Sequence, residues 1–261
     1  MRSLQRKIVA VMLISLCAAG ANAHTGNNAT IHLFTEEAAP LAFTEGNQLR
    51  GMSVEITREL IQRTASRDAV IKIRPWARGY YKALHEPNTA IFSTVRTPER
   101  EELFQWVGPI LVGTTSFYSL KSRNLKINTL QDAKASGPLA VPKKWYTFDA
   151  LTELGFDNLY GVATAKNMVT MLKHGRVKLI ATQDVTLKDE LATGGLKVAE
   201  VQSHAPFMHS AYYIAFSLST APEIVASWQR AFDDMRRDGT YAIILERWLP
   251  DADPEQSVPL P

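Results

Sequence analysis

Short apolar runs alternate with amphipathic stretches along most of the chain. The short runs favour β-strands, and apolar residues spaced three and four apart between them favour helices. Predicted strands cover residues 30–35, 69–73, 89–94, 139–141, 177–182 and 212–216. Predicted helices cover residues 52–64, 77–85, 129–136, 148–154, 164–174, 221–237 and 241–248. This alternation of strands and helices predicts the α/β class.

The clearest helical stripe lies near the C-terminus. Its apolar residues recur at three- and four-residue steps, which is the spacing of one buried helix face. They are Ile224, Val225, Trp228, Ala231, Phe232 and Met235. Gly239 follows this helix where a helix end favours a left-handed residue. The helix predicted at 52–64 has a similar face, made of Met52, Ile56, Leu60 and Ile61.

The first residues have the pattern of an export signal. Three basic residues precede a short apolar run at 8–20, and Ala-Asn-Ala at 21–23 forms an A-x-A cleavage site. The run is too short for a comfortable membrane span. We therefore expect residues 1–23 to be a cleaved signal peptide and the mature chain to begin at His24 in the periplasm. Cys17 follows a leucine instead of the small residue of a lipoprotein signal, which disfavours lipidation.

Removing the signal changes the charge and the available chemistry. It takes away three positive and no negative charges, so the formal net charge of +3 falls to about 0. A neutral chain gives no argument for binding nucleic acid or an anionic membrane. The only cysteine leaves with the signal, and the sequence has no P-loop, dinucleotide-binding glycine pattern or Cys–His metal spacing. We therefore expect no cofactor, no metal and no disulfide; His204 and His209, five apart, are a weak metal signal.

Two separated motifs carry a resemblance to a known family. Residues 92–109 read FSTVRTPEREELFQWVGP, with a Thr-Pro-Glu-Arg turn after an apolar strand. Residues 212–249 give a strand, a long helix, an Asp-Gly-Thr turn and a short helix that contains a tryptophan. In this order they resemble the bacterial extracellular solute-binding proteins of family 3, the periplasmic receptors of polar amino acid ABC transporters. The resemblance implies that Arg100 holds a ligand carboxylate, a role suited to a planar, always charged guanidinium. The alternative is a plain helix start, with Thr97 as its cap and Arg100 in solvent.

The same resemblance implies a two-lobed periplasmic binding protein of type II, with a ligand cleft between the lobes and a two-strand hinge. Lobe 1 would comprise residues 24–111 plus 212–261, and lobe 2 residues 112–211. The chain would cross between the lobes near 110–114 and near 210–213. A ligand bound between such lobes shifts the equilibrium towards the closed state by its higher affinity for that state.

Several residues of lobe 1 match positions that contact ligand in the family. Trp76 stands where family members carry a stacking aromatic, although a core position at a helix entry is the alternative. Arg78 would add a second cation or else be a solvated helix residue. Glu36 and Glu37 follow the first strand, and the sequence does not choose which of them faces the cleft. Ser93 stands where a small residue turns its backbone towards the ligand.

Lobe 2 departs from the family pattern. Lys143, Lys144, Trp145 and Tyr146 replace the small residues of a loop that holds the ligand carboxylate on its backbone N–H groups. These four residues line either the cleft or an outer surface of the lobe. In lobe 1, Val95 replaces a threonine hydroxyl that bonds the ligand.

The position that binds the ligand ammonium in the family also departs from the family pattern. Family members place an aspartate after the strand that here is predicted at 177–182, and Gln183 takes that place unless a one-residue slip brings in Asp184. An amide binds an ammonium less well than a carboxylate does. We therefore expect a carboxylate-bearing ligand that is not a standard polar amino acid, rich in negative charge or aromatic surface.

The resemblance implies a monomeric, non-catalytic receptor that passes its small-molecule ligand to a membrane ABC permease. A second hypothesis is a sensor, in which the closed receptor docks on a membrane signalling protein. A third is an enzyme, because some relatives of this fold are cyclohexadienyl dehydratases and Glu36 or Glu37 would then serve as a general acid.

Overall fold

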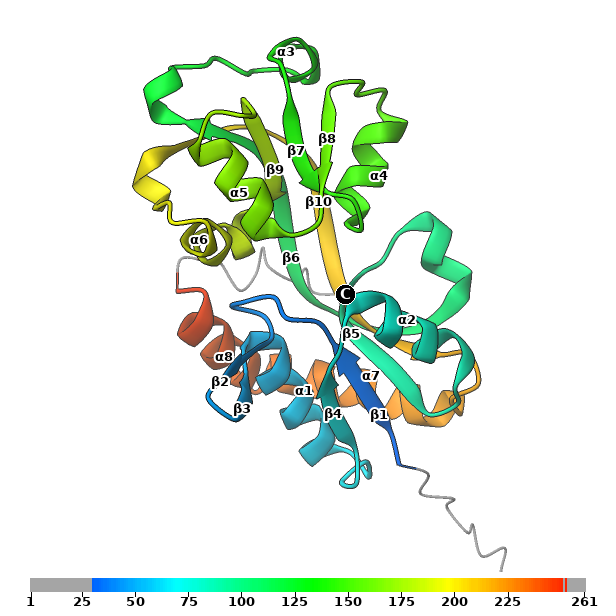
Figure 1. Ribbon diagram of the computed structural model, residues 1–261. Coiled ribbons are helices and arrows are strands. Elements are labelled where there is room, and N and C mark those ends of the chain that lie inside the picture. The colour runs from blue at the N-terminus through cyan, green and yellow to red at the C-terminus, as the bar shows by residue number, and fades with distance from the viewer. Residues whose placement is uncertain (1–29, 251, 253–261) are drawn as a thin grey trace, which may run out of the picture.

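The computed structural model describes residues 30–250 and 252. The predicted signal peptide and Cys17 lie outside the described residues. The chain forms two α/β lobes joined by two long strands (Figure 1). Lobe 1 holds the first strand together with the C-terminal helices, and lobe 2 holds the middle of the chain. The α/β prediction is therefore confirmed, and so is the two-lobed arrangement.

Lobe 1 is built on the parallel strands β4, β1 and β5, in that spatial order. Its strands are β1 (His32–Thr35), β2 (Phe43–Glu45), β3 (Gln48–Arg50), β4 (Val70–Ile73) and β5 (Thr89–Val95). Its helices are α1 (Met52–Arg63), α2 (Trp76–His85), the 3-10 helix η1 (Pro98–Leu103), α7 (Pro222–Arg237) and α8 (Thr240–Trp248). The strands β2 and β3 form a separate hairpin.

Lobe 2 is likewise built on three parallel strands, in the spatial order β9, β7 and β8. Its strands are β7 (Leu139–Pro142), β8 (Leu159–Val162) and β9 (Leu179–Gln183). Its helices are α3 (Leu130–Ala135), α4 (Tyr146–Glu153), α5 (Ala165–Lys173) and α6 (Asp184–Thr193), with the 3-10 helices η2 (Lys121–Arg123) and η3 (Val198–Glu200).

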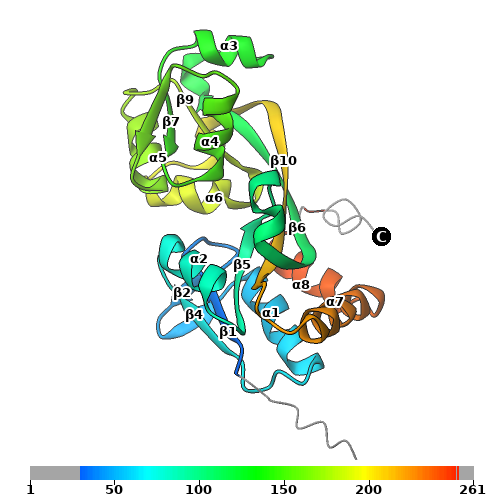
Figure 2. The same cartoon turned by 90° about the vertical axis from the view of Figure 1, so that its right-hand side faces the viewer.

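Two antiparallel strands, β6 (Phe104–Leu120) and β10 (Val201–Ser217), run from one lobe into the other (Figures 1 and 2). Ser210, Ala211 and Tyr212 of β10 pair with Gly113, Val112 and Leu111 of β6 between the lobes. This is the two-strand hinge that the resemblance implied. The points at which the chain crosses between the lobes, and the exact lobe boundaries, stay a prediction.

Alternation along the strands explains how each sheet supports helices on both faces. In β5, Ala90 and Phe92 face the core under α1, α7 and α8, while Ile91 faces the core under α2. Successive strand residues point to opposite faces, so a strand buried on both sides is apolar throughout. In β7 of lobe 2, Ala140 packs with α5 and α6, and Leu139 packs with α3 and α4.

The predicted strands and helices all occur, with ends that differ by one or two residues except at β10. The C-terminal stripe is buried at every predicted position except Ile224, which is partly buried, and Gly239 is left-handed with φ of 83°. The sequence missed the hairpin β2–β3, the strand β8, the helix α6 and the full length of β6 and β10. The two hinge strands were missed because polar residues and a proline interrupt their apolar pattern.

Candidate ligand-binding cleft

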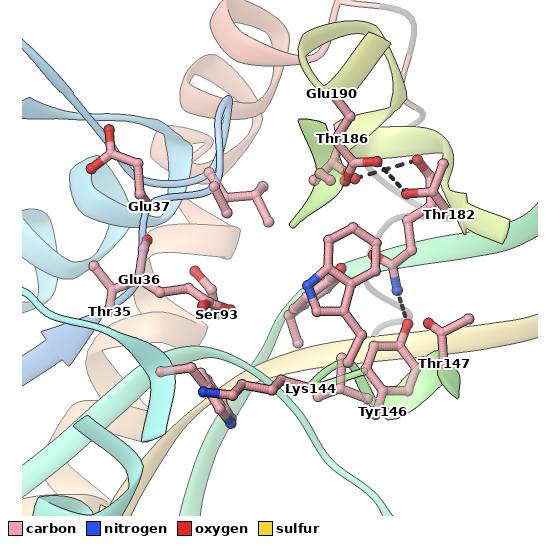
Figure 3. A pocket seen from close by; sticks show the side chains of 18 of the residues that line it. Thr35, Glu36, Glu37, Ser93, Lys144, Tyr146, Thr147, Thr182, Thr186 and Glu190 are labelled. Atoms are coloured by element: carbon pink, nitrogen blue, oxygen red, sulfur yellow. Dashed lines mark hydrogen bonds between the residues drawn. The ribbon is translucent and has the colours of Figure 1, made fainter. Parts of the chain in front are cut away.

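A cavity of about 300 Å³ lies between the lobes (Figure 3). Its walls come from residues at or just after the C-terminal ends of strands: β1, β4 and β5 in lobe 1, and β7, β8 and β9 in lobe 2. Ligands of open α/β sheets bind at this edge, because connecting loops diverge there and leave a crevice. The fold therefore places a ligand site where each lobe opens towards the other.

Arg100 lines this cavity from η1. Its Nη1 donates a hydrogen bond to the carbonyl oxygen of Val95 at 3.1 Å. The guanidinium carbon lies 5.5 Å from the ring centroids of both Trp76 and Tyr80, within range of cation–π attraction. Within residues 30–250 no carboxylate forms an ion pair with Arg100. Its remaining N–H groups are thus available to an anion in the cavity.

The helix-start alternative describes only the backbone of this turn. η1 begins after Thr97, with Pro98 in its first turn. A proline suits this place because its N–H would have no helical partner there. The turn therefore fixes the backbone as the alternative expected, but it holds Arg100 at the cavity wall and not in solvent, and the Thr97 side chain makes no capping hydrogen bond.

Aromatic side chains line both walls. Trp76, at the start of α2, packs against Tyr80 with ring centroids 5.6 Å apart. Trp145 and Tyr146, at the start of α4, line the cavity from lobe 2. Whether Trp76 and one of these residues enclose a ligand between them stays a prediction.

Glu36 and Glu37 both line the cavity, but their environments differ. The carboxylate of Glu37 is exposed and accepts a hydrogen bond from the backbone N–H of Thr44 at 2.8 Å. The carboxylate of Glu36 accepts no hydrogen bond from the described residues, and burial raises its pKa from 4.5 to about 7. Of these two carboxyl groups, Glu36 is therefore the one without a hydrogen-bond partner among the described residues.

Ser93 lines the cavity at an irregularity in β5. The pairing of β10 with β5 skips Ser93, because Tyr213 pairs with Thr94 and Ile214 pairs with Phe92. Its φ of 59° is left-handed, which is costly for a residue with a Cβ. Its buried Oγ has no hydrogen-bond partner in the described structure. A bulge thus turns this residue out of the sheet pattern and towards the cleft.

In lobe 2, Gln183 lines the cavity and Asp184 does not. Asp184 Oδ1 instead accepts hydrogen bonds from the backbone N–H groups of Thr114 at 3.0 Å and Val185 at 2.8 Å. The one-residue slip that would bring Asp184 into the site is therefore excluded by its contact with the hinge strand. The Oε1 of Gln183 is buried without a partner.

The Tyr146 hydroxyl joins α4 to the hinge. It donates to Ser210 Oγ at 3.1 Å and accepts a hydrogen bond from Gln183 Nε2. Its oxygen also lies 3.4 Å from Thr115 Oγ1. Tyr146 thus connects one wall of the cavity to both hinge strands.

Two of the expected site residues lie elsewhere. Arg78 is exposed on α2 and is not part of the cavity lining. Lys143 is also exposed, and the methylene groups of its side chain lie over Gly161 of β8. Lys144, one residue later, lines the cavity instead. The correction follows from the turn after β7, because consecutive residues of a turn point in different directions.

Glu190 is a cavity residue that sequence reasoning missed. Its Oε2 accepts a hydrogen bond from Thr182 Oγ1 at 2.6 Å. Burial is the main cause that raises its pKa, the Thr182 and Thr186 hydroxyls oppose the rise, and Asp189 adds to it. Thr182 lies on β9, whereas Thr186 and Glu190 lie four residues apart on α6, the spacing of one helix face. Figure 3 shows them on the wall opposite Glu36 and Ser93.

The cavity lining therefore carries charges of both signs. Arg100 and Lys144 are cations, while Glu36, Glu37 and Glu190 are carboxyl groups. Lobe 2 thus contributes one cation, Lys144, and one carboxyl group, Glu190, to the lining, because Lys143 lies outside it.

Within residues 30–250, no group of three or more His, Cys, Asp or Glu is placed to hold a metal ion. His204 Nε2 lies 2.8 Å from Ser119 Oγ, and His209 Nδ1 lies 3.2 Å from Thr114 Oγ1. Among the helices of the described chain, none has the length and apolar character to span a membrane.

The family model for bacterial extracellular solute-binding proteins, family 3, matches residues 31–251. No curated protein sequence matches the chain. The match covers both lobes and the hinge.

Solved structures share the fold at low sequence identity. A histidine kinase sensor domain with similarity to periplasmic binding proteins is 16% identical, with a TM-score of 0.73 over 84% of this chain and 96% of its own. An ancestral arginine-binding protein bound to arginine is 19% identical, with a TM-score of 0.70 over 84% and 98%. An ancestral amino acid-binding protein, a precursor of cyclohexadienyl dehydratase, is 18% identical, with a TM-score of 0.71 over 84% and 95%. At these identities the likeness establishes the two-lobed fold.

Proposed function

The chain belongs to the bacterial extracellular solute-binding proteins of family 3, and from this membership we propose that it captures a small carboxylate-bearing ligand between its lobes. Such a family places the protein outside the cytoplasm. With the signal pattern at residues 1–23, the proposed compartment is the periplasm, and the proposed recipient of the ligand is a membrane ABC permease.

One observation carries the proposal: the Arg100 guanidinium lines a cavity between two hinged lobes and has no carboxylate partner in the described structure. A guanidinium held on one side by Val95 and stacked on Trp76 has lost rotational freedom before a ligand arrives. Pre-ordering of this kind lowers the entropy cost of binding. Contacts to both lobes would then favour the closed state.

The first test is to identify by mass spectrometry the compound released from purified, denatured protein, and then to measure its affinity by calorimetry. Arg100→Ala should weaken binding by about 2–5 kcal/mol, because a charged pair is lost from a desolvated site. Arg78→Ala is the matched control, since it removes the same charge from an exposed position outside the cavity. Equal affinity of wild type and Arg100→Ala would refute the assignment.

A second candidate function is acid catalysis in the same cleft. Glu36 supports it, because a carboxyl group with a pKa of about 7 is half protonated at neutral pH and suits a general acid. The fold is also shared with a precursor of cyclohexadienyl dehydratase. Incubation with cyclohexadienyl acids would distinguish the candidates: consumption by wild type that Glu36→Gln abolishes would favour catalysis, and unchanged acids would favour binding alone.

A third candidate function is signalling instead of transport, in which the closed receptor docks on a membrane signalling protein. The likeness to a histidine kinase sensor domain motivates it. Both roles use the same hinge. Membrane vesicles that contain a co-encoded permease would test delivery to a transporter. Uptake of the released compound that depends on added receptor would support it.

A further inference from the structure

We infer that lobe 2 carries a second binding surface, a groove along the strand β8 that fits an extended acidic segment of a partner protein. The groove has a volume of about 430 Å³ and lies between β8 and α5. It is separate from the ligand cavity, because Ala163 is the only residue that lines both. The inference therefore goes beyond the proposed function and does not depend on the identity of the ligand.

The strand β8 stands at one end of the continuous sheet and pairs only with β7 (Figure 1). The backbone N–H and C=O groups along its outer side can therefore pair with an added strand. Natural edge strands are commonly protected by a charged residue or a proline. The strand β4, at the other end of the sheet, has Lys72 among its four residues, whereas β8 reads Leu-Tyr-Gly-Val. Of these two edges, β8 is thus the one open to pairing.

An exposed aromatic ring stands on this edge. Tyr160 and Val162 point to the α5 face of the sheet, because Val162 packs in the core under α5 and side chains two apart share a face. Val162 is buried, but Tyr160 is 53% exposed. Met171 of α5, which is partly buried, lines the same groove. An apolar side chain of an added strand would bury surface against Tyr160 and Met171.

The charged residues of the groove are all cations. Lys166 and Arg176 line it, and no Asp or Glu does. No ion pair within residues 30–250 includes either of them. Lys143 lies on the other face of β8, where its methylene groups cover Gly161. Charge complementarity selects partners, so these cations favour an acidic segment over a basic one.

The positions of the two cations suggest a spacing for the acids. Lys166 lies in the first turn of α5, and Arg176 follows the end of that helix at Lys173. At about 1.5 Å per residue, the helix separates these ends of the groove by about 10 Å or more. Residues four apart in an extended strand are about 13 Å apart and share a face. The segment that fits has two acids four residues apart, with an apolar side chain midway against Tyr160.

Amide NMR titrations of the isotopically labelled mature protein test the inference with synthetic peptides. Acetyl-SETFTES-amide should shift the signals of residues 159–162, and acetyl-SKTFTKS-amide should bind at least tenfold more weakly, because it presents like charges to the groove. Two further acidic peptides carry N-methyl groups on odd-numbered or on even-numbered residues. Alternate amides of a strand point to opposite sides, so strand addition requires that one of these peptides loses binding and the other keeps it.

The double variant Lys166→Glu, Arg176→Glu should bind the acidic peptide at least tenfold more weakly than wild type and should prefer the basic peptide. Lys126→Glu with Lys188→Glu is the matched control, because both lysines are exposed on lobe 2 outside the groove. The control should bind as wild type does.

Equal binding of the acidic and basic peptides, binding that survives the double variant, or no binding at millimolar peptide would overturn the inference. Shifts caused by inorganic phosphate without binding of the peptide would identify a small-anion site and also overturn it. Self-association in sedimentation experiments that the double variant abolishes would make a second copy of this chain the occupant, which would overturn the acidic partner.

Discussion

The Glu36 carboxyl group should make the ligand-free protein less stable as the pH rises from 4.5 to 7. Glu36 follows β1 at the cavity wall, and burial raises its pKa from 4.5 to about 7. The folded protein therefore binds this proton more tightly than the unfolded chain does. Stability from this group is fully present below pH 4.5 and is lost as the pH rises through 7, because the unfolded state has already released the proton.

The size of the effect follows from the shift. A rise from 4.5 to about 7 is about 2.5 pH units, and each unit corresponds to about 1.36 kcal/mol, so the loss is about 3 kcal/mol. Glu36→Gln keeps the shape of the side chain and removes the charge. We expect the variant to match wild type below pH 4.5 and to exceed its unfolding free energy by up to about 3 kcal/mol at pH 8.

Urea unfolding of both ligand-free proteins between pH 4 and pH 8 measures this difference. Glu37→Gln is the control, because the Glu37 carboxylate is exposed and hydrogen-bonded to Thr44, so its removal should give no gain at pH 8. If the unfolding free energies of wild type and Glu36→Gln changed in parallel with pH, water would solvate the Glu36 carboxyl in the folded protein. The reasoning about its burial would then be wrong.

Three further outcomes follow from the described contacts. Trp76→Ala should lose most of the tryptophan fluorescence change on titration with the released compound and bind it more weakly, since the ring lines the cavity; full retention of both would contradict stacking. Tyr146→Phe should lower the unfolding free energy by about 1 kcal/mol in urea titrations, because the hydroxyl bonds Ser210 and Gln183; an unchanged midpoint would contradict this. Trp228→Ala should cost about 3–5 kcal/mol by the same assay, because the side chain is fully buried; a loss below 1 kcal/mol would mean that the core refills the space.

The residues of the cleft show how much of the site could be predicted from the sequence. Most of the side chains expected at the site line the cavity, Arg100 and Trp76 among them. They were predicted because the resemblance assigns roles to their positions, which lie near strand ends or in a recognisable turn. Arg78 and Lys143 were misplaced because a sequence pattern gives the neighbourhood of a residue but not the direction of its side chain. Glu190 was missed because the helix α6 that carries it was not predicted.

Helix α6 was missed for a physical reason. Its buried residues are Thr186, Leu187 and Leu191, so the apolar stripe has only two residues and a hydroxyl is buried beside it. A helix whose inner face lines a polar cleft must place hydroxyls and a carboxylate where a core helix places leucines. The rule that finds buried helix faces therefore fails where the binding site lies.

By itself the sequence determined the α/β class, the strands and helices with clear apolar periodicity, and the turn that carries Arg100. These features depend on residues close in the chain, whose spacing decides which face is buried. Only the tertiary structure decided that Lys144 and Glu190 enter the cavity, that Asp184 turns to the hinge, and that the Glu36 carboxylate accepts no hydrogen bond from the described residues. These outcomes depend on the direction in which each turn points its side chains and on contacts between segments distant in sequence, such as the hydrogen bond from the Thr114 N–H to Asp184.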